Sequence, residues 1–361
     1  MEQVKAEINI PLIMVGRLDP DLGEQVLARR KTDFVAMGRR LLADPELPNK
    51  VAPGRIGDVT PCIACMDCID HVVSQKREVR CSVNPALGME PESVIEKSAK
   101  PKKVLVAGGG PAGLESARVS AIRGHQVTLW EKEAQLGGQL RLAVIPPGKE
   151  RVQPLIDYLE AQVKKLGVKI ELSKEATPEL VSGAKPDAVI LATGPGSLGS
   201  DIPGSESATV VSPEEVLTGE AKVGEKIVII GGGLVGCETA DFLTEENRDV
   251  TILEMLPKMA AKMTLALRYL LLSRLKQKGV AMLTNVTVER FTTKGITIMR
   301  EGRSQTLDAD TIVWAAGTVP DTGLFKAVNG KVPEVYVIGD SREPRNILES
   351  MAEGFRTGQK I

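Results

Sequence analysis

Four cysteines are the first residues of this sequence whose types and spacing could do chemistry. Cys62, Cys65, Cys68 and Cys81 follow the pattern C-x2-C-x2-C-x12-C. Three thiolates at steps of three residues can wrap one corner of a cubane, and a later fourth thiolate closes it, as in loops that hold [4Fe–4S] clusters. Zinc remains an alternative, although zinc sites more often use two separated C-x2-C pairs. Purely structural cysteines remain a third interpretation.

Two glycine-rich segments form the second set of candidate residues. Residues 103–131 and 226–254 align without a gap at an offset of 123, which indicates that one supersecondary unit is used twice. Each segment carries G-x-G-x-x-G between a predicted strand and a predicted helix. In this motif the glycines allow a tight turn, the approach of a pyrophosphate and close helix packing. The glycines are Gly108, Gly110 and Gly113 in the first segment and Gly231, Gly233 and Gly236 in the second.

An acidic residue ends the strand that follows each glycine motif. Glu131 and Glu254 each stand 18 residues after the third glycine, where a carboxylate is expected to bind a ribose hydroxyl. The sequence therefore predicts two dinucleotide sites. A carboxylate repels a 2′-phosphate and no arginine follows Glu254, so we expect NADH rather than NADPH at the second site. Lys258 is the nearby cation that could reverse this preference, although a solvated surface lysine is its ordinary role.

Other reactive side chains are few. Cys237 lies in the second glycine-motif helix, where a small buried thiol is expected. His71, just after the third cysteine, is more often a loop residue than a ligand, and His125 ends a predicted helix. No C-x2-C or C-x4-C follows either glycine motif, which argues against a dithiol relay. No serine or cysteine triad is evident, and we assign no catalytic residue.

Composition narrows the functional class. Over 361 residues the formal net charge is -1, and no long run of one sign occurs, so we expect neither a nucleic-acid nor a membrane-surface partner. No segment has 18 consecutive apolar residues, and the first residues lack a signal-peptide pattern. Clustered cysteines in such a chain favour metal binding in a reducing compartment, and we expect a cytoplasmic protein.

The elements that position these residues are predicted to form an α/β protein. Residues 8–15 and 33–37 have strand character, helices are expected over 19–30 and after Gly38, and residues 55–100 lack clear periodicity. Two nested Rossmann-like domains follow. The predicted segments are a pair of β/α units at 1–54, the cysteine segment at 55–100, a first nucleotide domain at 101–212 and 320–361, and a second at 213–319.

With these motifs the chain resembles the C-terminal portion of the 2,4-dienoyl-CoA reductase / trimethylamine dehydrogenase family. These are old-yellow-enzyme-type NADH:flavin oxidoreductases with fused iron–sulfur and FAD/NAD domains, and the resemblance covers essentially the whole chain. It implies that the four cysteines ligate the cluster and that the second glycine segment, with Gly317, binds NAD(H). Gly137, Gly138 and Gln139 match the family's LGGQ loop near the flavin. The implied FAD residues are Gly108, Gly110, Pro111, Ala112, Gly113, Glu131, Lys132, Gly138, Gln139, Gly194, Gly339 and Asp340.

The same resemblance explains the N-terminal segment. Residues 1–54 resemble the last two β/α units of a TIM barrel, in which the loops after strands 7 and 8 often bind phosphate. Gly16, Arg17, Gly38 and Arg39 match the family's FMN-phosphate positions. The first six units are missing, so we expect a fragment, a barrel completed by a partner chain, or a repurposed end. FMN is expected only if the barrel is completed, and oligomerisation is left open.

The resemblance also implies an activity. Electrons are expected to pass from NADH to FAD, then to [4Fe–4S], and then to an FMN site or a partner, and in the full family they reduce activated C=C bonds of the enoyl- or dienoyl-CoA type. An electron-transfer subunit that docks on a separate barrel chain, and an amine-dehydrogenase-type module, are the alternatives. A degenerate module that binds adenine nucleotide without redox chemistry is a third.

Overall fold

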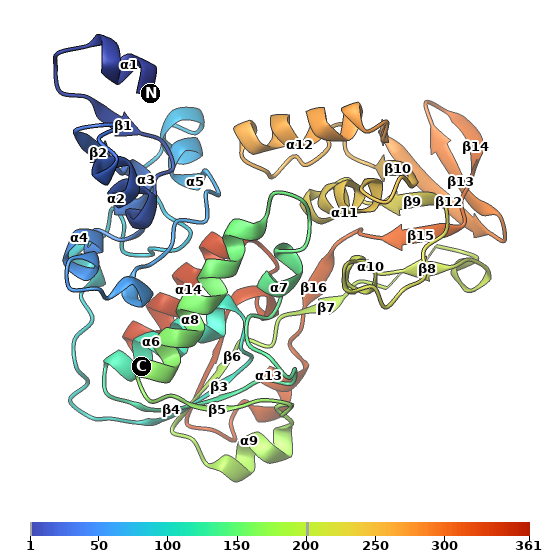
Figure 1. Ribbon diagram of the computed structural model, residues 1–361. Coiled ribbons are helices and arrows are strands. Elements are labelled where there is room, and N and C mark those ends of the chain that lie inside the picture. Colours follow the sequence, from blue (N-terminus) through green and yellow to red (C-terminus); the bar gives the residue numbers. More distant parts are fainter. Residues whose placement is uncertain (1, 200–201) are drawn as a thin grey trace.

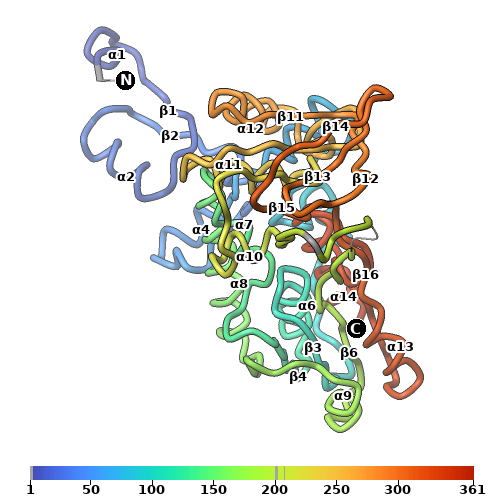
Figure 2. Tube along the Cα trace, turned by 90° about the vertical axis from the view of Figure 1, so that its right-hand side faces the viewer, coloured from blue at the N-terminus to red at the C-terminus, as the bar shows by residue number. Residues whose placement is uncertain are grey.

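Two parallel sheets dominate the computed structural model, which describes residues 2–199 and 202–361. Figure 1 shows the first sheet in the lower part of the molecule and the second at the upper right, with the N-terminal segment at the upper left. The turned view of Figure 2 also places this N-terminal segment at the edge of the molecule. The predicted α/β class with Rossmann-like domains is confirmed.

The first sheet has five parallel strands in the order β17-β6-β3-β4-β5. Its residues alternate between two cores, because successive strand side chains point to opposite faces. Val104 and Val106 pack with α6, α8 and α14 on one face, whereas Leu105 and Ala107 pack with α9 and α13 on the other. The elements are β3 (Lys103–Ala107), α6 (Pro111–Ile122), β4 (Gln126–Trp130), α7 (Leu140–Ala143), α8 (Gln153–Lys165), β5 (Lys169–Glu171), α9 (Pro178–Ala184), β6 (Ala188–Leu191), α13 (Gly323–Val328), β17 (Glu334–Val337) and α14 (Ile347–Lys360).

The second sheet repeats this plan with one change. Its parallel order is β11-β10-β9-β15-β8, with helices on one face and the antiparallel sheet β12-β13-β14 on the other. The elements are β8 (Val210–Val211), α10 (Pro213–Thr218), β9 (Lys226–Ile230), α11 (Leu234–Thr244), β10 (Asp249–Glu254), α12 (Leu265–Gln277), β11 (Ala281–Thr284), β12 (Val286–Thr292), β13 (Gly295–Arg300), β14 (Arg303–Asp308) and β15 (Thr311–Trp314).

A short antiparallel ribbon carries the chain between the two sheets. β7 (Pro195–Ser197) leaves the first sheet and pairs with β16 (Thr318–Pro320), which returns to it. β8 pairs with β15, so the second sheet takes in Val210 and Val211, which lie before the expected domain start at 213. Two consecutive valines carry too little periodicity to reveal this membership from sequence.

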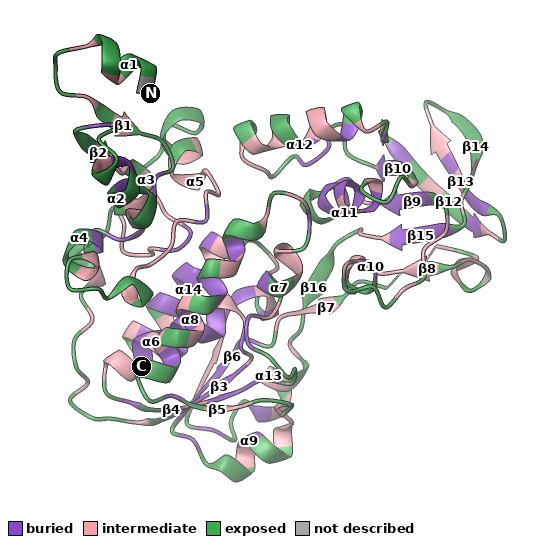
Figure 3. Ribbon diagram, viewed as in Figure 1, coloured by how far each residue is buried: buried purple, intermediate pink, exposed green. Residues whose placement is uncertain are grey.

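The N-terminal segment forms two β/α units, at the positions expected for them. β1 (Ile13–Val15) pairs in parallel with β2 (Phe34–Ala36), and Asp19 caps the helix between them through a 2.8 Å bond from Leu22 N. Figure 3 shows that much of this segment is exposed, whereas the central strands of both large sheets are buried. The helices here are α1 (Glu2–Glu7), α2 (Pro20–Ala28), α3 (Gly38–Ala43) and α4 (Leu47–Val51).

Residues 55–100, which lack clear periodicity in the sequence, are largely irregular. The short helical pieces are η1 (Ile56–Asp58), α5 (Asp67–Ile69), the π-helix η2 (Asp70–Ser74) and η3 (Pro91–Ser93). Within residues 2–199 and 202–361, no helix combines the length and the apolar character needed to cross a membrane.

Candidate functional site: two glycine elbows and a cysteine pocket

The first glycine motif forms a tight elbow between β3 and α6. Gly108 has φ +108°, and an added Cβ would lie 2.2 Å from the Ala192 carbonyl oxygen. An added Cβ at Gly113 would lie 1.9 Å from the Gly108 oxygen, so helix and strand touch backbone to backbone there. Gly110 instead caps the helix with φ -76° and has only Gly138 Cα near its Cβ position, at 4.0 Å. Its open side is therefore the one that a pyrophosphate could approach.

The second elbow, between β9 and α11, reproduces this geometry. Gly231 has φ +108°, and an added Cβ there would lie 2.2 Å from the Ala315 oxygen. An added Cβ at Gly236 would lie 1.9 Å from the Gly231 oxygen. Gly233, the middle glycine, has no atom within 4 Å of its Cβ position. Both predicted elbows thus exist, and each combines two glycines required by packing with one that leaves space for a ligand.

The two acidic residues sit at the rims of these elbows, held by backbone amides. Glu131 accepts bonds from Gly109 N at 2.6 Å and from Glu133 N at 2.9 Å. Glu254 accepts the matching pair, from Gly232 N and Leu256 N, both at 2.8 Å. These bonds fix each carboxylate beside the turn, where a ribose of a bound dinucleotide would lie.

The internal repeat extends beyond the 29 residues that the sequence reveals. Gly137 N bonds to Gly109 O at 2.8 Å, and Ala260 N, 123 residues later, bonds to Gly232 O at 2.7 Å. Asp187 N bonds to Lys103 O, and Asp310 N to Lys226 O, with the same offset. Gly194 and Gly317, the predicted ends of the closing strands, are also 123 apart, and both have positive φ. Residues 103–194 and 226–317 therefore share one framework.

The LGGQ loop lies against the first elbow. Gly138 has φ +51°, and a Cβ there would lie 2.9 Å from Gly110 Cα. Pro111 and Ala112 begin α6, and a Cβ at Gly339 would lie 2.9 Å from Ala112 Cβ, so the C-terminal predicted residues meet the elbow as well. Gln139 and Lys132 are exposed.

Asp340 lies in η6 (Gly339–Ser341), directly after β17, and burial raises the pKa of its carboxyl group. Its oxygen accepts a 3.1 Å bond from Arg345 N. Two neighbours were missed in the sequence. Glu353 on α14 accepts a 2.8 Å bond from Gly339 N, and the hydroxyl of Ser341 accepts a 3.0 Å bond from Gly194 N. A buried glutamate in a helix has no local signal, but Ser341 directly follows the predicted aspartate.

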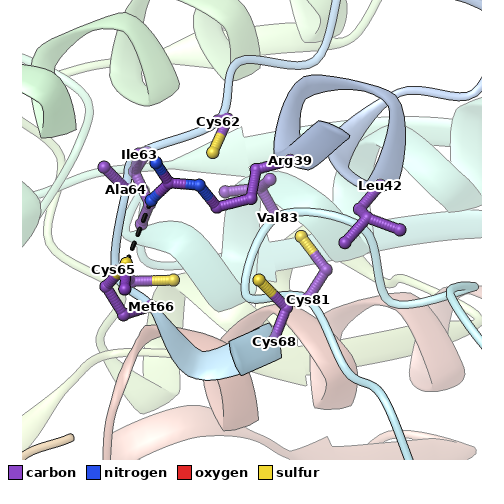
Figure 4. Close-up of a pocket in the computed structure, with 10 residues that line it drawn as sticks. All are labelled: Arg39, Leu42, Cys62, Ile63, Ala64, Cys65, Met66, Cys68, Cys81 and Val83. Atoms are coloured by element: carbon purple, nitrogen blue, oxygen red, sulfur yellow. Dashed lines mark hydrogen bonds between the residues drawn. The ribbon is translucent and has the colours of Figure 1, made fainter. Parts of the chain in front are cut away.

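The four predicted cysteines line one small pocket (Figure 4). All four are free and partly buried, and Cys62, Cys65 and Cys81 pack against the core of the first domain. The loop that carries them is sharply turned, because Ala64 and Met66 adopt φ of +56° and +66°. Left-handed non-glycine residues are uncommon, and backbone turned in this way forms concavities that bind anions, including iron–sulfur centres.

The thiols interact electrostatically with one another. Burial raises the pKa of Cys68 and of Cys81, and the neighbouring Cys62 raises both further. Burial, with the Asp67 carboxylate, raises the pKa of Cys65 to about 12. The Cys65 thiol lies 3.3 Å from the Ser82 hydroxyl, which in turn donates to Asp67. Such thiols are costly to ionise unless they bind a positively charged centre.

No group of three His, Cys, Asp or Glu side chains is arranged around a single metal ion in the part of the chain that the structure describes. Four cysteine thiols are a donor set that a [4Fe–4S] cluster would use, with one thiolate on each iron. Thiolates of a cubane bind different irons, so the four sulfurs surround a core rather than converge on one point.

His71 is partly buried in η2, and Cys237 is fully buried in α11, as expected for a small core thiol.

The predicted FMN-phosphate residues do not behave alike. Gly16, Arg17 and Gly38 are exposed near the ends of β1 and β2. The side chain of Arg39 is turned to the cysteine pocket instead, with Nη1 3.0 Å from Met66 Sδ. The structure therefore does not bring these four residues together as one phosphate cradle.

Comparisons with known proteins agree with this architecture. Residues 102–354 match the pyridine nucleotide-disulphide oxidoreductase family, and residues 1–57 match the NADH:flavin oxidoreductase / NADH oxidase family. The chain is 38% identical to an NADH oxidase of Thermoanaerobacter brockii, covering 100% of this chain and 57% of the relative. It is 36% identical to a cinnamate reductase of Clostridium sporogenes, covering 100% and 54%.

Among solved structures, a 2-naphthoyl-CoA reductase in complex with 2-naphthoyl-CoA superposes with a TM-score of 0.95 at 36% identity, covering 99% of this chain and 55% of that one. The chain thus spans about half the length of the curated relatives that it matches. The matched families support binding of flavin and nicotinamide cofactors.

Proposed function

We propose, for a chain that belongs to the 2,4-dienoyl-CoA reductase / trimethylamine dehydrogenase family, that it is the NADH-oxidising part of a flavin and iron–sulfur oxidoreductase. In this proposal the first elbow binds FAD, the second binds NADH, and the four cysteines hold a [4Fe–4S] cluster. Electrons enter from NADH and leave through the cluster for an FMN site or a partner chain. The cofactors supply hydride and one-electron chemistry, and the protein supplies position and electrostatics.

One observation carries this proposal: two matching elbows and a four-thiol pocket lie in a single chain, with the pocket packed on the first domain. Each elbow keeps an open middle glycine and a fixed carboxylate, as a bound dinucleotide requires. Cys62, Cys65 and Cys81 contact the first domain's core, so a cluster there would be close to the FAD domain. Electron transfer from flavin to cluster needs this proximity.

The substrate class follows from the relatives and is also a proposal. The names of two relatives, a cinnamate reductase and a 2-naphthoyl-CoA reductase, state that they reduce a conjugated acid and a thioester. We propose that the whole protein reduces an activated C=C bond of the enoyl-thioester type. The pocket for that substrate would lie in the barrel, of which this chain holds only β1, β2 and their helices.

A second candidate function, an electron-transfer subunit docking on a separate barrel chain, is favoured by the exposed strands of the N-terminal segment. Ile13, Val15 and Phe34 are 57%, 70% and 57% exposed. Two strands cannot close a barrel, so their apolar side chains need further β/α units. We also propose a cytoplasmic location, because a reducing compartment keeps clustered cysteines available as metal ligands.

The test is reconstitution of the chain with FAD, iron and sulfide under anoxia, followed by addition of NADH. We expect the flavin absorbance to bleach, and we expect the Gly233→Ala variant, in which the second elbow is filled, to bleach far more slowly at the same NADH concentration. A flavin that stays oxidised with NADH but bleaches with dithionite would refute the proposal.

A further inference from the structure

The turn after β17 lies on the side of the first elbow away from Glu131. In the first sheet β3 stands between β4, which leads into Glu131, and β6, which pairs with β17. A dinucleotide in the crevice at the carboxyl ends of these strands has its pyrophosphate at the elbow and one ribose at the acidic residue. Its other half is therefore expected over the ends of β6 and β17. In FAD this other half is the flavin with its chain of hydroxyl groups.

Asp340 is the acidic side chain on that side of the elbow. It is partly buried in η6, directly after β17. An added Cβ at Gly339 would lie 2.9 Å from Ala112 Cβ, so this turn touches the start of α6. Asp340 Oδ1 accepts a 3.1 Å bond from Arg345 N, and no side chain among the residues that the structure describes donates to either carboxylate oxygen. A carboxylate has several acceptor positions, so this one can still accept bonds from ligand hydroxyls.

Glu353 on α14 holds both ends of the turn that carries this aspartate. Glu353 is only 8% exposed, and its Oε2 accepts a 2.8 Å bond from Gly339 N. Its Oε1 accepts a bond from the guanidinium of Arg345, whose backbone amide donates to Asp340. Arg342 Nη1 approaches the same oxygen at 3.3 Å. One buried carboxylate thus fixes the residue before Asp340 and the residue that bonds to Asp340.

The ionised form of Glu353 suits these contacts better than any neutral side chain of its size. All of its neighbours named above are donors: the Gly339 amide and the guanidinium groups of Arg342 and Arg345. A glutamine would turn its own NH2 donor toward one of them. Burial of a carboxylate is costly unless it is paired and hydrogen-bonded, and a residue that only filled space on α14 would need no charge.

We propose that Glu353 is a positioning residue of the first nucleotide site, which holds the 339–345 turn so that the Asp340 carboxylate faces the flavin half of FAD. Side chains that bind a ligand are held in place by such supporting hydrogen bonds. This inference rests on the proposed function, because it requires FAD at the first elbow. It makes Glu353 a determinant of the preference for FAD over ADP, which shares only the adenosine diphosphate half.

The experiment compares Glu353→Gln with Glu349→Gln in the full chain, prepared without flavin and loaded with iron and sulfide under anoxia. Glu349 lies four residues earlier on α14. Its carboxylate pairs with Arg80 at 3.4 Å and lies 3.8 Å from Arg345 Nη1, and it bonds to neither end of the 339–345 turn through a backbone amide. The two variants therefore remove the same charge from the same helix. Isothermal titration calorimetry gives the dissociation constants of FAD and of ADP.

In Glu353→Gln we expect the dissociation constant of FAD to rise about tenfold, the usual effect of losing one hydrogen bond to a charged group. The dissociation constant of ADP should not change, whereas a general loss of structure would weaken both ligands. Glu349→Gln should bind both ligands like the unchanged chain. In an Asp340→Asn background, Glu353→Gln should add no further loss, because its effect passes through Asp340.

An unchanged FAD constant in folded Glu353→Gln, or an equal loss for FAD and ADP, would overturn the inference. Losses that multiply in the double variant Asp340→Asn/Glu353→Gln would overturn it as well. If Glu353→Gln does not fold, Arg345→Gln decides, because this exposed residue supplies the other end of the same contact. An unchanged FAD constant in Arg345→Gln then refutes the inference. A failure of the proposed function looks different, because the unchanged chain itself would bind FAD no more tightly than ADP.

Discussion

Two glycines of the second elbow have different roles: Gly236 is required for packing, whereas Gly233 leaves space for a ligand. At Gly236 a Cβ would lie 1.9 Å from the Gly231 oxygen, whereas at Gly233 it would meet no protein atom within 4 Å. Gly233 also has φ -69° and ψ -168°, which alanine adopts freely. Gly233→Ala should therefore keep the melting temperature and raise the KM for NADH at least about tenfold, the effect of losing roughly 1.4 kcal/mol of binding.

Gly236→Ala is the matched control, because it should lower the melting temperature and the yield of folded chain through the backbone clash. Circular dichroism melts and NADH-dependent flavin reduction measure both effects. Equal destabilisation by the two substitutions would show that the middle glycine is also a packing requirement and would remove the evidence for a ligand space.

Glu254 tests the choice of nicotinamide cofactor. Its carboxylate is held beside the elbow by Gly232 N and Leu256 N, and no cation among the described residues bonds to it. Glu254→Gln keeps the size of the side chain but removes the charge that repels a 2′-phosphate. We expect the NADH:NADPH ratio of kcat/KM to fall about tenfold, through a higher KM for NADH and a lower KM for NADPH. A ratio that does not change would assign the preference to another residue, with Lys258 the first to examine.

At the scale of elements, an ion pair joins the two nucleotide domains. Lys149, between α7 and α8, pairs with Glu238 on α11, and both side chains are largely buried. The internal repeat shows why this pair must cross the boundary. Glu115, the counterpart of Glu238, bonds to Arg118 on its own helix at 2.7 and 2.8 Å. The position equivalent to Arg118 is Asp241, which pairs instead with Arg274 and Lys278.

This pair predicts a dependence of stability on pH. Burial raises the pKa of Glu238, nearby Asp241 raises it further, and Lys149 and Arg274 lower it. A carboxyl group with a raised folded-state pKa contributes stability that is present at low pH and lost as the pH rises through that pKa. Lys149→Met removes a lowering charge, so the loss in melting temperature relative to the unchanged chain should grow from pH 5 to pH 8.

The double variant Lys149→Met/Glu238→Gln is the control, because it leaves no buried charge unpaired. It should recover most of the loss at pH 8, where Lys149→Met alone should cost about 2 kcal/mol. Melts of both variants across this pH range measure the effect. A loss that stays constant with pH would show that the pair adds nothing beyond packing.

The elements predicted from sequence are those with strong local patterns. The apolar strands β3, β6, β9 and β15 and their glycine turns were visible because each pattern is local. Contacts between residues that are distant in the sequence produce no local sequence pattern. For this reason the sequence did not predict the roles of Glu353 and of the Lys149–Glu238 pair. The phosphate contact that the Arg39 motif predicts stays a prediction, and the structure places Arg39 Nη1 3.0 Å from Met66 Sδ.

At the scale of the molecule, the second candidate function predicts that the N-terminal segment docks on β/α units of a separate chain. Ile13 and Val15 expose one apolar row on β1, and Phe34 lies opposite Ile13 on β2. Ile13→Lys/Val15→Lys should abolish association with six β/α units supplied as a separate chain, measured by light scattering. Tyr269→Lys, at an equally exposed residue on α12, is the control and should still associate. Equal association of both variants would place the contact elsewhere.

The central claim is that NADH, FAD and the cysteine cluster form one electron path within this chain. Reductive titration of the anoxically reconstituted chain with NADH tests it most directly, with flavin absorbance and electron paramagnetic resonance recorded on the same samples. We predict uptake of a flavin's electron pair plus one further electron, with the reduced-cluster signal rising as the flavin bleaches. A bleached flavin beside a cluster that only added dithionite can reduce would contradict it.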